Sequence, residues 1–133
     1  MNSELIEILN IIPYRLEESL QNSSESYLSF QPGNDARSPS EILSHLVDVS
    51  NYGLSILNVP KPIDSEKSVL KQINGNLVVM KSYLSHNKVD MDTTKKLING
   101  PLSDTLTHIG QLAFLRRLEG SPIEWENYTN ADT

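Results

Sequence analysis

Apolar residues recur at helical spacing in four separate stretches of this 133-residue chain, and this pattern constrains the fold more than any other feature. A side chain returns to the same helix face every three or four residues, so each stretch predicts a helix with one buried stripe. The four stripes are Leu5, Leu9, Ile12, Leu16 and Leu20; Ile42, Leu46, Val49, Leu54 and Leu57; Val69, Leu70, Ile73, Leu77, Met80 and Leu84; and Leu106, Ile109, Leu112, Ala113, Leu115 and Leu118. Four such helices predict an all-α four-helix bundle. No repeat or domain boundary interrupts the chain, so we expect one domain over residues 1–133.

Local signals predict where these helices begin and bend. Ser38-Pro39-Ser40-Glu41 combines a capping box with proline at the first helical position, which predicts the start of the second helix. Pro13 lies inside the first stripe and predicts a kink or a restart, because proline lacks the N–H group and crowds the preceding turn. Asp64 and Ser65 are expected caps of the third helix. Gly100-Pro101 is expected to open the fourth helix.

The segments between the helices are polar. Residues 22–37 are expected to form a loop that Tyr27, Leu28 and Phe30 anchor to the core. Residues 86–99 predict an irregular connection, with a short strand-like piece around 97–98. After Gly120 and Pro122 stop the fourth helix, Trp125 and Tyr128 are expected to fold back onto the bundle.

Composition excludes several classes of function. The net charge is −6 and there is no basic stripe, so nucleic acid is not an expected partner. The absence of cysteine removes disulfides, thiolate metal sites and cysteine nucleophiles. The N-terminal residues do not resemble a signal peptide, and no apolar run reaches the ~20 residues of a membrane span. We therefore expect a cytoplasmic protein with no membrane contact.

Two histidines and an aspartate make up the candidate chemical site. His45 lies in the middle of the second predicted helix, and Asp104 and His108 lie four residues apart on one side of the fourth. Metal sites in bundles are built from ligands that facing helices direct inward, and imidazole with carboxylate suits zinc, nickel, iron or manganese. Asp48 and Gln111 are candidates for orienting the imidazole rings.

Each of these residues also has a purely structural interpretation. A single histidine beside an apolar helix face is more commonly a satisfied core residue than a ligand. Asp104 lies near a helix N-terminus, where the helix dipole favours a carboxylate whatever its function. The arginines at 116–117 are expected to place one side chain in water and the other in an internal ion pair with a residue such as Glu119. From pattern alone, the metal site stays one of two alternatives.

Two motifs are similar to a known family. SPSEILSHLVD at Ser38 to Asp48 and THIGQLAFLRRLEGSPI at Thr107 to Ile123, with Asn127-Tyr128, resemble the DinB-like superfamily of metal-dependent bundle proteins. The resemblance implies a bundle of the DinB/YfiT-like type. It also implies a site of three histidines, matched by His45 and His108, with Asp104 at the position of the third.

The departures from the family pattern change what the resemblance implies. Asp104 is shorter than histidine, so its oxygen either completes a His-Asp-His set or accepts a hydrogen bond from one of the rings. Arg37 stands where relatives often carry an aromatic residue that covers the site.

The family resemblance implies one of two reactions, metal-dependent hydrolysis or transfer of a small thiol to an electrophile. The ligands would be His45, Asp104 and His108, the partner a small-molecule substrate or thiol, and the assembly a homodimer. A second hypothesis belongs to another class. In it the chain is a metal-free DinB-like scaffold that binds a small molecule or dimerises without catalysis, and Asp104 favours this hypothesis.

Overall fold

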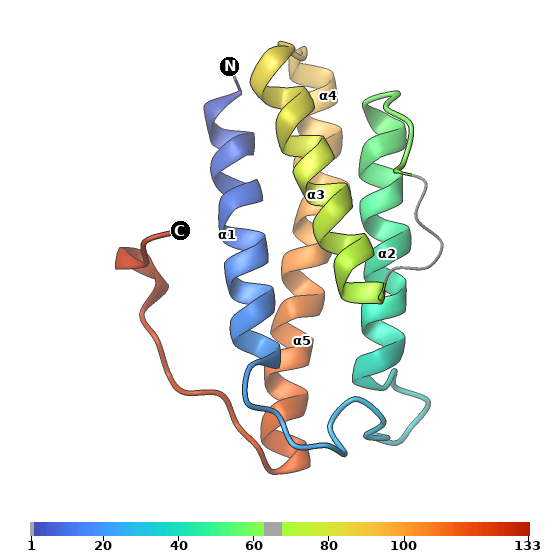
Figure 1. Cartoon of the computed structure of the whole chain (residues 1–133), viewed down its shortest axis with the longest axis vertical. Coiled ribbons are helices and arrows are strands. Elements are labelled where there is room, and N and C mark those ends of the chain that lie inside the picture. The colour runs from blue at the N-terminus through green and yellow to red at the C-terminus, as the bar shows by residue number, and fades with distance from the viewer. Residues whose placement is uncertain (1, 63–67) are drawn as a thin grey trace.

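Four long helices run side by side in the computed structural model, which describes residues 2–62 and 68–133 (Figure 1). They are α1 (Ser3–Leu20), α2 (Pro39–Ile56), α3 (Val69–His86) and α5 (Ser103–Glu119). The described part of the chain contains no strand. The prediction of an all-α protein with four long helices is thus confirmed.

The four helices pack in a ring. α1 and α2 follow each other in the sequence but are not neighbours in this ring. α1 packs against α3 and α5, and α2 packs against the same two helices. α2 and α3 run in one direction along the bundle, while α1 and α5 run in the other (Figure 1). The bundle is therefore not a simple up-and-down one, and α2 and α5 become antiparallel neighbours. This contact brings the two predicted site segments together.

The capping box at the start of α2 forms as predicted. The Ser38 hydroxyl accepts from the Glu41 backbone N–H at 3.3 Å, and the Glu41 carboxylate accepts from the Ser38 backbone N–H at 3.1 Å. These bonds satisfy two donors that a helix N-terminus leaves without partners inside the helix. The pKa of Glu41 is lowered chiefly because its carboxylate accepts from the Ser38 backbone N–H, and the Ser38 side chain acts in the same direction. The cap fixes where His45 lies, two turns further along α2.

Two expectations about helix starts have different outcomes. α1 is one helix from Ser3 to Leu20 with Pro13 inside it, so the predicted restart does not occur. Pro13 is tolerated because the loss of one hydrogen bond is outweighed by the stripe that buries Leu9, Ile12 and Leu16. The predicted caps Asp64 and Ser65 lie outside the described residues. The N-cap of α3 is Ser68, whose hydroxyl accepts from the backbone N–H three residues later.

The connection between α3 and α5 is helical, so the prediction of an irregular or strand-like piece around 97–98 was wrong. α4 (Met91–Leu97) begins at Asp90, whose carboxylate accepts from the Thr93 backbone N–H at 2.7 Å. Residues 98–102 then form a kinked turn that leads directly into α5. Gly100 bends this turn with φ −100° and ψ −107°, values outside the helical range. Helical backbone resumes at Pro101 and leads into α5, so the predicted opening of the fourth helix at Gly100-Pro101 is confirmed.

The core lies along the bundle axis and consists mainly of the predicted stripe residues. Two of them, Leu70 and Leu118, are instead exposed, and Leu28 of the loop is exposed as well. Tyr27, by contrast, has no exposed surface, and its hydroxyl donates to the Leu112 carbonyl at 2.6 Å. The loop after α1 is thus anchored through Tyr27. None of the described helices has both the length and the apolar character needed to cross a lipid bilayer.

The C-terminal segment returns to α1 in part. The Tyr128 ring meets the Tyr14 ring edge-on with centres 6.1 Å apart, and the Arg15 guanidinium lies 4.7 Å above the Tyr128 ring. The Tyr14 hydroxyl also donates to Glu126 at 2.6 Å. Tyr128 therefore folds back as predicted. The same prediction for Trp125 was wrong, because that side chain is 87% exposed.

We expect Gly75→Ala to stabilise the protein by about 0.5–1 kcal/mol, because glycine in a helix loses more backbone freedom on folding than alanine does. An added Cβ at Gly75 meets no atom within 4 Å. Gly53→Ala is the contrasting variant, since its Cβ would lie 2.5 Å from Cε of the buried Met80. Urea unfolding of both variants and of the wild type measures the differences in the free energy of unfolding. A loss of stability in Gly75→Ala would contradict the prediction.

Candidate functional site

His45 of α2 and His108 of α5 lie face to edge between the two helices. Their ring centres are 4.8 Å apart and their planes meet at 86°. Both side chains are half-buried. The two imidazoles predicted to meet across the bundle therefore do come together, because α2 and α5 are direct neighbours.

The separation of the rings is compatible with one shared metal ion. A zinc ion lies about 2.1 Å from an imidazole nitrogen and the ring centre about 1.1 Å further, so two rings at an angle of about 95–110° have centres about 4.7–5.2 Å apart. The observed 4.8 Å falls in this range.

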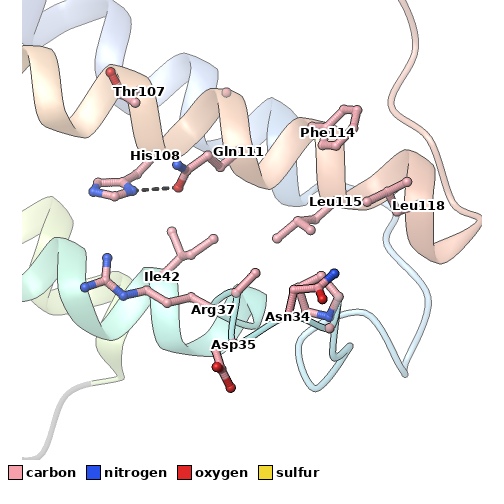
Figure 2. A pocket seen from close by; sticks show the side chains of 14 residues that line it. Asn34, Asp35, Arg37, Ile42, Thr107, His108, Gln111, Phe114, Leu115 and Leu118 are labelled. Atoms are coloured by element: carbon pink, nitrogen blue, oxygen red, sulfur yellow. Dashed lines mark hydrogen bonds between the residues drawn. The ribbon is translucent and has the colours of Figure 1, made fainter.

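Gln111 orients the His108 ring. Its side-chain Oε1 lies 2.8 Å from His108 Nδ1, one turn further along α5 (Figure 2). An amide oxygen only accepts, so Nδ1 donates in this hydrogen bond, and in the neutral ring Nε2 then carries the lone pair. The prediction that Gln111 contacts a site histidine is confirmed. This contact leaves Nε2 as the nitrogen that can bind a cation or accept a proton.

The surroundings of His45 favour its neutral form. Partial burial, the Arg37 guanidinium and His108 lower the pKa of His45, in that order of size, while Asp48 and Asp104 oppose the shift. Burial disfavours the charged ring because water no longer solvates it fully, and nearby positive charge acts in the same direction. Metal ions bind neutral imidazole, so the lowered pKa widens the pH range in which His45 can be a ligand.

The same shift predicts how stability depends on pH. In the metal-free protein the free energy of unfolding should fall as the pH drops below about 6.5, the ordinary pKa of histidine. Below that value the unfolded chain takes up a proton that folded His45 resists, so stability falls with pH until His45 also protonates in the folded state. Urea unfolding at pH 7.5 and 5.0, with a chelator present, measures the loss.

The control variants separate His45 from the other titrating groups. His45→Gln should show a smaller loss of stability between the two pH values than the wild type. His86→Gln should keep the wild-type loss, because His86 is an exposed residue at the end of α3. An equal loss in wild type and His45→Gln would show that His45 does not cause the effect.

Asp104 does not complete a ligand set in the described arrangement. It lies in the first turn of α5, one turn before His108, and its side chain is exposed. His108 hydrogen-bonds Gln111, and no described contact joins it to Asp104. Among residues 2–62 and 68–133, no group of three or more histidine or acidic side chains is placed to hold a metal ion. The charge of Asp104 nevertheless raises the pKa of His45.

A cleft of about 820 Å³ opens beside His108 (Figure 2). One wall is the outer face of α5, with Phe114 and Leu118, and the other is the loop at residues 32–37 that precedes α2. Ile42 and Leu115 are buried residues at the base of the cleft.

A second, shallower hollow of about 400 Å³ lies beside His45 and is lined by polar residues of α2 and the preceding loop. Arg37 lines both hollows, so it lies at the border between the two histidines' surroundings.

Two residues of the cleft were not anticipated from the sequence. Phe114 lies outside the predicted apolar stripe, and Leu118 was assigned to the buried face. In the structure they are 61% and 53% exposed, four residues apart on one face of α5. One sequence feature could have predicted this exposed wall. Phe114 falls on the polar side of the helix, outside its otherwise regular apolar stripe. A large aromatic residue there indicates an exposed apolar wall.

Comparison of the chain with protein-family models, with curated proteins and with solved structures gives no match.

Proposed function

We propose that this chain is a DinB-like helical-bundle protein in which His45 and His108 bind a divalent cation and Asp104 supplies a third ligand. The observation that carries this proposal is the 4.8 Å separation of the two ring centres. The neutral form favoured at His45 and the oriented Nε2 of His108 also support it.

Asp104 would join the set by turning about its own side-chain bonds. It is exposed and one helical turn from His108, so a change of rotamer costs little and keeps it on the same side of α5. Two histidines with one carboxylate leave coordination positions open, which is typical of catalytic rather than structural sites. The donor set therefore fits zinc, nickel, iron or manganese.

The reaction class follows from this donor set together with the resemblance. A divalent cation would act as a Lewis acid toward a bound substrate, in metal-dependent hydrolysis or in transfer of a small thiol. The chain's own residues would hold the ligands in place, through Gln111, and position a substrate in the adjoining cleft. A homodimer in the cytoplasm, with a small-molecule substrate or thiol as partner, belongs to the same proposal.

The test is metal binding by the untagged protein. Purified without chelators, the protein should bind about one zinc, nickel, manganese or iron ion per chain, measured by elemental analysis and by titration against a fluorescent chelator. Loss of residues that only orient ligands costs about 10–100-fold in affinity. Each of His45→Ala and His108→Ala should therefore weaken binding by about 100-fold or more.

Two further variants define the site. His86→Ala is the matched control, because it removes the third histidine of the chain. His86 is the last residue of α3. Asp104→Ala should weaken binding by about tenfold or more if the carboxylate is a ligand. Binding in the wild type that is unchanged in His45→Ala and His108→Ala would overturn the proposed site.

A second candidate function is a metal-free scaffold that binds a small molecule. The specific observation in its favour is that the described residues hold no ready set of three donors, while a large cleft adjoins His108. This candidate predicts no stoichiometric metal under any of the loading conditions. The titration above therefore separates the two functions.

A further inference from the structure

We infer that the cleft between α5 and the loop at 32–37 binds an amphiphilic carboxylate, with its apolar chain against Phe114 and Leu118 and its carboxylate beside Arg37 and His108. This inference deepens the proposed function by naming the substrate class, and it rests on that function where it places the carboxylate next to the cation site. The argument has three parts: an apolar wall, a cationic end and a matching length.

The apolar wall is unusual for a helix face turned to solvent. Phe114 and Leu118 are each more than half exposed and follow each other at a spacing of four residues along α5. They border a cleft whose base holds the buried Ile42 and Leu115, so their exposed surface continues into an apolar floor (Figure 2). An apolar concavity with a few polar groups at one end is the usual form of a small-molecule site.

The polar end of the cleft carries an arginine available for a ligand. Arg37 lines the cleft, is exposed, and has no hydrogen-bond or ion-pair partner among the described residues. Its side chain extends on the His108 side of the cleft, whereas the Asp35 carboxylate points away from α5 (Figure 2). The nearby Glu41 carboxylate is already bonded to the Ser38 N–H. A guanidinium binds carboxylate through two parallel hydrogen bonds, which gives this end its preference for an anion.

The length of the apolar wall sets the size of the ligand. An α-helix rises 1.5 Å per residue, so Phe114 lies about 9 Å and Leu118 about 15 Å along α5 from His108. At about 1.25 Å per methylene group, an extended chain of roughly eight to twelve carbons covers this distance. A chain of two to four carbons would leave the exposed apolar wall in contact with water.

Decanoate is the probe that tests these three features, with acetate and decan-1-ol as the comparison ligands. Calorimetry and NMR titration of the full chain, with zinc and again with chelator, should show decanoate binding at least about tenfold more tightly than acetate. Phe114→Ala should weaken decanoate binding by about tenfold, from the loss of buried apolar contact. Arg37→Gln should weaken decanoate binding but leave decan-1-ol binding unchanged.

Matched controls exclude general effects of mutation. Trp125→Ala removes another exposed aromatic side chain, and Arg117→Gln removes another exposed arginine of the chain; neither residue lines the cleft. Both variants should bind decanoate as the wild type does. Circular dichroism confirms that each variant is folded before the titration.

The outcomes separate this inference from the proposed metal site. Decanoate binding that depends on Phe114 and Arg37 supports the inference, whether or not the protein takes up zinc. Zinc binding without decanoate binding would overturn the inference and leave the metal proposal standing. Equal affinity for acetate and decanoate, or an unchanged affinity in Phe114→Ala, would also overturn it.

Discussion

Replacing Asp104 by histidine is expected to raise the affinity of the protein for zinc by about 100-fold. The variant would carry histidines at 104 and 108, one helical turn apart on α5, facing His45 on α2. Residues four apart on a helix lie on the same side, so both imidazoles can reach an ion placed beside His45. The longer imidazole also reaches further than the aspartate that it replaces.

The measurement is competition for zinc against a fluorescent chelator at pH 7.5. Arg117→His is the control, since it adds a histidine to the exposed surface of the same helix more than two turns from His108. The control should match the wild type. A failure of Asp104→His to gain affinity would show that position 104 does not point toward the two existing rings, whichever side chain it carries. That result would remove Asp104 from the proposed ligand set.

The helices could be predicted from the sequence because their signals are local. The apolar stripes and the capping box at Ser38 depend on residues three or four positions apart, and the structure reproduces the capping box and most of the stripe residues. α4 was missed because it has only seven residues, too few for a stripe to be recognised. Its local signals were the cap at Asp90 and the Asp92–Lys96 ion pair at 3.1 Å. These signals are weaker than a buried stripe, because exposed pairs contribute little free energy.

From the sequence we could predict which two helices carry the candidate site, but not the shape of the site. The spacing of His45 within α2 and His108 within α5 indicated that both rings lie near the bundle interior. Which helices become neighbours is decided by packing of the whole chain, and the contact of α2 with α5 follows from their positions in the ring. The cleft could not be predicted, because it depends on how the loop at 32–37 lies against Phe114.

The ends of α1 and α5 are held together by one buried arginine. The Arg116 side chain is 2% exposed and donates to the carbonyls of Ser19, Gln21 and Ser121. These carbonyls lie at helix C-termini, where backbone acceptors lack partners within the helix and the helix dipole favours a cation. The guanidinium also lies 5.6 Å from the ring centre of the buried Tyr27. An ion pair with Glu119 was expected here, but the hydrogen-bond partners of Arg116 are carbonyls and a hydroxyl.

Glu119 has other partners, which explains the difference. Its carboxylate accepts from the Ser24 hydroxyl at 2.6 Å and from the Ser121 hydroxyl at 2.8 Å. The hydrogen bonds to Ser24 and Ser121 lower the pKa of Glu119, and the charge of Arg116 adds a smaller effect. Arg116 and Glu119 therefore hold the loops after α1 and α5 in place, each through its own hydrogen bonds. Both loops lie at the same end of the bundle (Figure 1).

Arg116→Met is expected to lower the free energy of unfolding by about 3–5 kcal/mol. Methionine fills much of the same volume but donates no hydrogen bond, so the buried Ser19 carbonyl and the partly buried Gln21 carbonyl lose this partner. Each buried polar group that loses its partner costs about 1–3 kcal/mol. Arg116→Lys should recover part of the loss, because one ammonium group supplies charge but cannot span the same carbonyls. Urea unfolding followed by circular dichroism gives both values.

Arg117→Met provides the matched comparison, since the neighbouring arginine is exposed and has no described hydrogen bond. Its effect should stay within about 0.5 kcal/mol, as for most surface substitutions. If Arg116→Met cost less than about 1 kcal/mol, water would have to reach the freed carbonyls, and the loop could not be held chiefly by the arginine. A large loss in Arg116→Met together with weaker decanoate binding in Arg116→Lys would show that the same anchor supports the loop wall of the cleft. The cleft would then depend on Arg116 through Tyr27 and the loop that Tyr27 anchors, although Arg116 itself does not line it.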